Sequence, residues 1–398
     1  MNLEHSHIMG GSTAKRRINC PGSLALEKAA PEQAPSEYAA RGSMLHAGME
    51  LLLTADPQNM EDAEPLLAEL IGQDLGFGED NEITQELVDN KLRPALDAWF
   101  EVRDSFDLDD WFIEQRVSME SVVPGSFGTT DILAKDKYAY LHVLDWKFGD
   151  GVAVEVEGNE GLGFYAASAM YDEDPELQEF CKDIDGVYLH IVQPRTGSAQ
   201  VLHTWKTDVA WIDKLVDQIE AATKAATADD APLKVGDWCQ FCRARMTCPA
   251  RQAMASQALS VAPKGMTSVD LGAAMTQAQQ LKSWISEVVK FAQEQAEAGA
   301  VIPGFKLVTK RPTRVWGDEK AAEKVFRDAK IPVAKFTNKK LISPTQAQKL
   351  DKKLYDTKLS DIVAMHSSGL TLVQDSDKRQ AVTSSIELLA AALPEQET

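Results

Sequence analysis

The sequence predicts an α/β protein in which helices flank a mixed β-sheet, followed by a mainly helical region. Three runs near the middle of the chain are rich in Val, Ile, Tyr, Phe and Trp and are separated by turn residues, a pattern typical of an antiparallel meander: 111–120, 126–135 and 138–148. Segments with helical periodicity stand on both sides of these runs. A chain of 398 residues with 44% hydrophobic content can bury a large core and form two or more structural units.

The segments before the meander are expected to be helical. Helices are predicted over 21–31 and 36–53, separated by a turn that contains proline. Residues 56–106 are acidic and mostly helical in pattern, which indicates a helical insertion lying over the core.

The segments after the meander complete the sheet and its helices. We expect a helix over 160–173, strands over 185–193 and 199–206, and a helix over 208–227. A linker is then expected at 262–265.

That linker divides the chain into residues 1–260 and residues 266–398. The second part is predicted to begin with a long amphipathic helix over 266–299. A short strand pair around 305–316 and several small helices follow.

Charge is unevenly distributed along the chain. The formal net charge of −20 disfavours nucleic-acid binding, because phosphate neutralisation requires Lys and Arg. Residues 301–380, however, contain 17 Lys plus Arg and 9 Asp plus Glu, a net charge of +8, so the remainder carries −28. These lysines are either solvated helix faces or a surface that contacts nucleic acid, and the sequence favours neither interpretation.

Composition also bears on the compartment. No run of about 18 apolar residues occurs, and the segment 1–17 is polar and lacks the apolar stretch of a secretory signal. We therefore expect an intracellular protein without a membrane span. Five cysteines are too few for a disulfide scaffold in a chain of this length, and clustered cysteines in a reducing compartment more often bind metal.

Two neighbouring predicted strands carry charged residues near their ends. Alternation along a strand places Asp145 and Lys147 on one face, about 6.6 Å apart, with Trp146 on the other. A hairpin would bring Asp131 to the same face. Two carboxylates suit Mg²⁺ or Mn²⁺, because hard cations prefer oxygen ligands. A lysine beside such a metal can orient or deprotonate a water molecule.

The cysteines give a second local signal. Cys239, Cys242 and Cys248 lie within ten residues, so their sulfurs can surround one metal centre. Cys20 is the best candidate for a fourth ligand, because Cys181 stands alone in an acidic region. Four thiolates suit either a tetrahedral Zn²⁺ or a [4Fe-4S] cluster, and the spacing does not distinguish them.

Together these motifs resemble the PD-(D/E)xK nuclease superfamily, and more narrowly its RecB-like exonuclease branch with an iron-sulfur staple. The resemblance rests on an N-terminal cysteine, His46 on a helix, Gly-x-x-Asp131, Asp145-x-Lys147, a helix with Tyr165, and a late C-x2-C-x5-C motif. Their order and spacing make the combination specific.

Three further segments are similar to a phage and prophage family of such nucleases: 36–46, 307–316 and 372–379. The resemblance therefore covers nearly the whole chain. It implies a restriction-endonuclease-like mixed sheet flanked by helices and stapled by a [4Fe-4S] cluster (alternatively Zn²⁺) at the four cysteines, with a mainly helical C-terminal appendage. It also implies a bacterial cytoplasmic setting.

The resemblance assigns roles to individual residues. His46, Asp131 and Asp145 would bind Mg²⁺ or Mn²⁺ together with the backbone carbonyl of Trp146, and Lys147 would position or activate the attacking water. Tyr165 would belong to the catalytic helix. Products in this branch carry a 3′-hydroxyl and a 5′-phosphate.

The chain departs from the family pattern at one position. Relatives usually have a glutamine four residues before the tyrosine, where this chain has Gly161. Asn159 or Glu160 would be within one helical turn to replace it. We expect a metal-dependent deoxyribonuclease, of the exonuclease type, that acts in phage recombination, replication or repair alongside a single-strand annealing or single-strand-binding protein. The alternative is a DNA-binding or assembly protein that keeps the fold and the cysteine centre with weakened activity.

Overall fold

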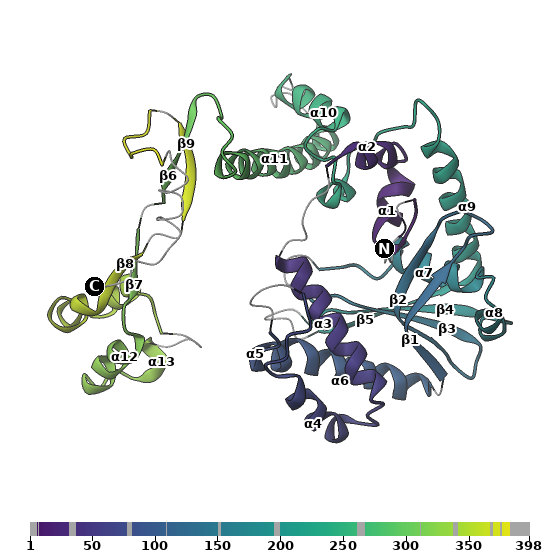
Figure 1. Cartoon of the computed structure of the whole chain (residues 1–398), viewed down its shortest axis with the longest axis horizontal. Coiled ribbons are helices and arrows are strands. Elements are labelled where there is room, and N and C mark those ends of the chain that lie inside the picture. Colours follow the sequence, from purple (N-terminus) through teal and green to yellow (C-terminus); the bar gives the residue numbers. More distant parts are fainter. Residues whose placement is uncertain are drawn as a thin grey trace. The chain divides into compact units, whose positions relative to one another are not determined.

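The computed structural model describes residues 6, 8–31, 37–77, 82–108, 110–149, 153–194, 200–260, 267–310, 312–336, 341–366, 369–374 and 376–382. The expected linker at 262–265 lies outside these residues. Contacts divide the chain into a first unit, Met1–Leu281, and a second unit, Lys282–Thr398 (Figure 1). Each unit is described by itself.

The first unit contains a sheet and the helices that cover it. In chain order its elements are α1 (Gly11–Asn19), α2 (Ser23–Ala29), α3 (Glu37–Thr54), α4 (Met60–Leu70), α5 (Gln85–Leu87), the π-helix η1 (Val88–Leu92), α6 (Arg93–Phe106), β1 (Asp110–Ser118), β2 (Phe127–Lys135), β3 (Tyr140–Trp146), α7 (Glu160–Met170), α8 (Pro175–Phe180), β4 (Gly186–Val192), β5 (Leu202–Asp208), α9 (Val209–Ala226), the 3₁₀ helix η2 (Asp237–Phe241) and α10 (Pro249–Ser260).

Five strands form one mixed sheet in the order β1-β2-β3-β4-β5. The pair β3–β4 is parallel and the other three pairs are antiparallel. The predicted meander and the mixed α/β class are confirmed. A parallel neighbour of β3 requires a crossover connection, and α7 and α8 lie in that connection.

Helices cover both faces of the sheet, so that alternate residues of each central strand enter two different cores (Figure 1). On one face, helices α3, α4 and α6 pack against Ile132, Leu144 and Trp146. On the other face, α1, α7 and α9 pack against Leu133 and Val143. Burial on both faces explains why β3 is almost continuously apolar.

Helix α1 is an element that the sequence did not reveal. Its segment is polar, and its buried residues are Ala14, Arg16 and Arg17. Because two arginines occupy the buried face, the apolar periodicity that normally predicts an amphipathic helix is missing.

The second unit has its own small elements. They are the end of α11 (Ser268–Glu297), which crosses the boundary, then β6 (Phe305–Thr309), β7 (Thr313–Trp316), α12 (Glu319–Asp328), α13 (Val333–Phe336), α14 (Pro344–Leu350), α15 (Lys352–Leu354), η3 (Tyr355–Leu359), η4 (Ser360–Ile362), β8 (Val363–His366) and β9 (Leu370–Gln374).

The strands expected around 305–316 exist, but the prediction that they pair with each other was wrong. β6 pairs with β9, and β7 pairs with β8, both antiparallel. β8 lies about fifty residues after β7 and β9 about 65 residues after β6, so local sequence could not identify these partners. Among the described residues, no helix has both the length and the apolarity needed to cross a membrane.

Two buried histidines lie side by side in the sheet. His142 Nδ1 is 3.0 Å from His190 Nε2, and His190 Nδ1 is 3.0 Å from Thr204 Oγ1. His142 Nε2 lies 3.4 Å from a carboxylate oxygen of Asp136. Burial, only partly offset by Asp136, lowers the pKa of His142 to about 4, and burial also lowers the pKa of His190.

These histidines should make the fold sensitive to acid. The unfolded chain takes up their protons near the ordinary pKa of 6.5, before the folded protein does. The free energy of unfolding contributed by this pair is therefore complete above that pH and falls as the pH drops towards 4. We expect urea denaturation to show a smaller loss of stability between about pH 7.5 and pH 5.5 for His142→Gln/His190→Gln than for the wild type. An equal loss in both proteins would contradict this expectation.

Candidate functional site

Three carboxylates stand in one row across three neighbouring strands. Asp131 on β2 is opposite Asp145 on β3, one position beyond the pair Ile132–Leu144. Asp131 also faces Glu114 on β1, the other neighbour of β2. The ladder pairs before and after this position are Ile113–Ile132 and Gln115–Thr130. Opposed residues of antiparallel strands share a face, so the sheet itself gathers these acids.

Glu114 has an unusual backbone conformation. Its φ is 49°, in the left-handed region, and it forms no ladder pair with Asp131. A non-glycine residue in this region costs about 1–2 kcal/mol, and such strain is concentrated at functional sites. Burial and the charge of Asp131 raise the pKa of Glu114 to about 7. The sequence analysis did not identify this residue, although extending the meander's register to β1 would have placed it beside Asp131.

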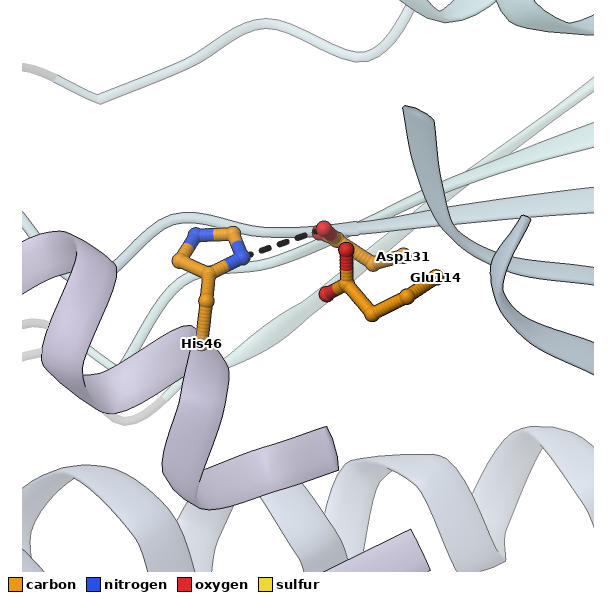
Figure 2. A group of neighbouring side chains, drawn as sticks. All are labelled: His46, Glu114 and Asp131. Atoms are coloured by element: carbon orange, nitrogen blue, oxygen red, sulfur yellow. Dashed lines mark hydrogen bonds and ion pairs between the residues drawn. The ribbon is translucent and has the colours of Figure 1, made fainter. Parts of the chain in front are cut away.

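His46 completes a group of three potential metal ligands. One ligand atom each from His46, Glu114 and Asp131 lies within 4.8 Å of the others, and Figure 2 shows the imidazole and both carboxylates pointing toward one another. His46 Nδ1 is 3.0 Å from Asp131 Oδ1. Although burial favours the neutral imidazole, Asp131 and Asp145 raise the pKa of His46. The ring of Phe148 packs edge-on against His46 at 5.4 Å and limits its rotation.

Asp145 and Lys147 form an ion pair beside this group. Lys147 Nζ lies 2.5 Å from Asp145 Oδ2. Burial raises the pKa of Asp145. Despite partial burial of Lys147, the carboxylates of Asp145 and Asp131 raise its pKa, so this lysine is held in its charged form.

Trp146 contacts the site through its backbone. Its amide donates a hydrogen bond of 2.5 Å to Asp131 Oδ2. That bond fixes one oxygen of the carboxylate while the other faces His46. The expected role of the Trp146 carbonyl as a metal ligand stays a prediction.

Tyr165 lies on α7 with its ring between two glycines. A Cβ added to Gly11 would be 2.3 Å from the ring, and a Cβ added to Gly128 would be 2.8 Å from it. The glycine of the Gly-x-x-Asp motif therefore leaves room for this ring. Burial and the nearby carboxylates of Asp145 and Asp131 raise the pKa of Tyr165, so its hydroxyl stays protonated.

The same contact with α1 gives a reason for Gly161. A Cβ at this position would lie 2.8 Å from the Gly11 carbonyl oxygen, so α1 occupies the space that a glutamine side chain would need. The Asn159 side-chain oxygen caps α7 by accepting from the Gly161 and Leu162 amides.

Gln193, directly after β4, is a buried polar residue that the sequence analysis missed. Its Nε2 donates to the Gly149 carbonyl at 3.0 Å, and its Oε1 accepts from the Val154 amide at 3.1 Å. The two bonds hold both ends of the segment that follows Lys147.

Four of the five cysteines meet at one pocket of the first unit: Cys20, Cys239, Cys242 and Cys248. The remaining cysteine, Cys181, packs instead among the apolar residues beside α7, and burial raises its pKa to about 12. Burial also raises the pKa of Cys242 to about 11. Metal binding at this pocket would therefore release protons.

Three arginines also line the pocket: Arg16, Arg245 and Arg251. Their charge complements the negative charge of four thiolates. Arg16 also belongs to a buried ion-pair network, in which Glu27 accepts from Arg16 at 3.2 Å, from Arg17 at 2.8 Å and from the Arg243 amide at 2.8 Å. This network joins α1, α2 and the cysteine loop through the Glu27 carboxylate.

Comparison with known families matches residues 5–380 to the family described as "Protein of unknown function (DUF2800)". The chain belongs to this family. Among solved structures, this DUF2800 member is similar to the chain titled "Crystal structure of SSO0001", with 11% sequence identity and a TM-score of 0.26. The match covers 60% of this chain and 84% of that chain.

Removal of the Glu114 carboxylate should weaken metal binding. If Glu114, His46 and Asp131 share one cation, Glu114→Gln loses a charged ligand, and we expect at least about tenfold weaker Mn²⁺ binding by titration calorimetry. Glu101→Gln is the matched control, because Glu101 is an exposed acid on α6 and does not belong to the group of potential ligands. Equal affinities of the two variants would exclude Glu114 as a ligand.

Proposed function

We propose that this protein is a metal-dependent DNA nuclease, of the exonuclease type. The observation that carries the proposal is the cross-strand row of Glu114, Asp131 and Asp145, with His46 beside Asp131 and Lys147 paired with Asp145. Hard oxygen donors with one imidazole suit Mg²⁺ or Mn²⁺. The bound ion would polarise the scissile phosphate and lower the pKa of a water molecule.

The surrounding residues have distinct parts in this proposal. His46, Glu114 and Asp131 would hold the metal, and Asp145, which the structure pairs with Lys147 beside that group, would be a further ligand. Because its pKa is raised, Lys147 stays protonated. It would therefore orient the water and balance the charge on phosphate, and it would not act as the base.

Tyr165 would act as a hydrogen-bond donor beside the carboxylates, since its pKa is raised and its hydroxyl keeps its proton. Its ring lies so close to Gly11 and Gly128 that a Cβ added to either glycine would come within 2.8 Å of it. The packing of α1 at Gly161 accounts for the departure from the family pattern without loss of any charged group of the site.

The cysteine pocket supports a second part of the proposal, a [4Fe-4S] cluster bound by Cys20, Cys239, Cys242 and Cys248. Three arginines line the same pocket, and their charge would complement that of a cluster bound by four thiolates. Such a cluster would cross-link Cys20, directly after α1, to the segment that runs from η2 to Cys248.

The nuclease proposal is tested by DNA degradation. Wild type should degrade linear DNA in Mg²⁺ or Mn²⁺, and closed circular DNA should resist if the enzyme requires an end. Lys147→Ala and Asp145→Ala should lower the rate by about 100-fold or more. Lys137→Ala, which changes an exposed lysine at the turn before β3, should degrade DNA at the wild-type rate. A wild-type protein that leaves single- and double-stranded DNA intact in both metals would refute the proposal and favour the DNA-binding alternative.

The cluster proposal is tested by colour and metal content. Protein purified without oxygen should be brown, with absorption near about 400 nm, and Cys20→Ser should lose both the colour and its iron. Cys181→Ser is the matched control and should keep both, because Cys181 does not line the pocket. A colourless wild type that contains one zinc per chain would overturn the cluster.

A further inference from the structure

The proposed nuclease poses an electrostatic problem. The first unit, which contains all the site residues, has 22 Lys plus Arg and 46 Asp plus Glu, a net charge of −24. A surface of this charge repels a polyanion over about 10 Å at ordinary ionic strength. We therefore expect most of the affinity for DNA to come from a region with the opposite charge.

Basic residues accumulate in the second unit. Residues 301–380 have a net charge of +8. Their helices surround one small core formed by Phe326, Phe336, Tyr355 and Leu359. Eight lysines of the surrounding segments are exposed: Lys320, Lys324, Lys330, Lys335, Lys349, Lys352, Lys353 and Lys358.

These lysines carry charge that nearby acids do not neutralise. Within the described part of the chain, none of the eight forms an ion pair. Several acids of the same segments are engaged elsewhere: Asp318 and Asp351 cap helices by accepting from the Ala321 and Leu354 amides, and Glu323 pairs with Arg327.

The lysines also stand on an ordered scaffold. Arg314 on β7 joins three side chains of the following helices, with hydrogen bonds to Gln348 at 3.1 Å, to the Tyr355 hydroxyl at 3.0 Å and to Thr345 at 3.2 Å. Tyr355 and Leu359 are buried between the exposed lysines of their segment. Fixed positions lower the conformational entropy lost when a long phosphate backbone binds.

We propose that the exposed lysines of the second unit form the surface that binds the phosphate backbone of DNA. The inference rests on the proposed nuclease function, for which it supplies the substrate affinity that the first unit lacks. Lysine acts as a point charge on phosphate, so the binding is independent of base sequence and depends strongly on salt.

The test compares two full-length variants with equal charge change. The first converts Lys349, Lys352, Lys353 and Lys358 to Glu. The control converts four exposed lysines of the first unit to Glu: Lys137, Lys182, Lys214 and Lys224. Binding of a fluorescent DNA duplex is measured by anisotropy in EDTA over a series of salt concentrations, so that cleavage does not contribute.

We expect the first variant to bind at least tenfold more weakly than the control. The slope of its plot of log Kd against log salt concentration should be smaller by up to about 3.6, because each lost phosphate contact lowers the slope by about 0.9. A second version with Lys→Gln at the same four positions, and thermal unfolding of all variants, separates lost binding from misfolding. Equal binding of the first variant and the control, or no binding by the wild type at low salt, overturns the proposal. If the wild type binds DNA but does not cleave it in Mg²⁺, the nuclease proposal is overturned and the proposed DNA-binding surface is still supported.

Discussion

Mutual repulsion among three carboxylates is the constraint around which the first unit is built. Two such charges about 4 Å apart repel by about 4 kcal/mol at an effective dielectric constant of 20. The sheet nevertheless aligns Glu114, Asp131 and Asp145. Each is compensated differently, since Asp131 has the Trp146 amide and His46, Asp145 has Lys147, and Glu114 has a pKa raised to about 7. A divalent cation bound among the three carboxylates would offset the repulsion that remains.

Much of this site follows from the period of a β-strand. Alternation along β3 predicted that Asp145 and Lys147 share a face, and the meander predicted that Asp131 joins them; the structure confirms both. His46 could not be derived in this way. It lies on α3, and only the resemblance pointed to it. The sequence analysis did not identify Glu114, because a single acid on a strand is usually solvated. Its place beside Asp131 and Asp145 follows only from the register of all three strands, which spans two turns.

The parts that could not be predicted are contacts between elements far apart in sequence. Nothing in the sequence distinguishes three glycines of the site from other helix and strand residues: Gly11, Gly128 and Gly161. The structure shows that a Cβ at each would collide with Tyr165 or with the α1 backbone. The partners of β6 and β7 were hidden for the same reason. In contrast, the uneven distribution of charge along the chain could be counted from the sequence. The structure adds which acids cap helices or form ion pairs and which lysines are exposed.

The cysteine pocket has a consequence for how the chain is made. Its two halves are Cys20 and the loop that ends at Cys248, so the ribosome synthesises about 228 residues between them. At about 5–20 residues per second, this takes on the order of 11–46 s. During that interval α1 and α2 have neither the cysteine loop nor the Arg243 amide that Glu27 accepts from. The contacts of α1 and α2 with the cysteine loop can therefore form only after the chain has been synthesised as far as Cys248.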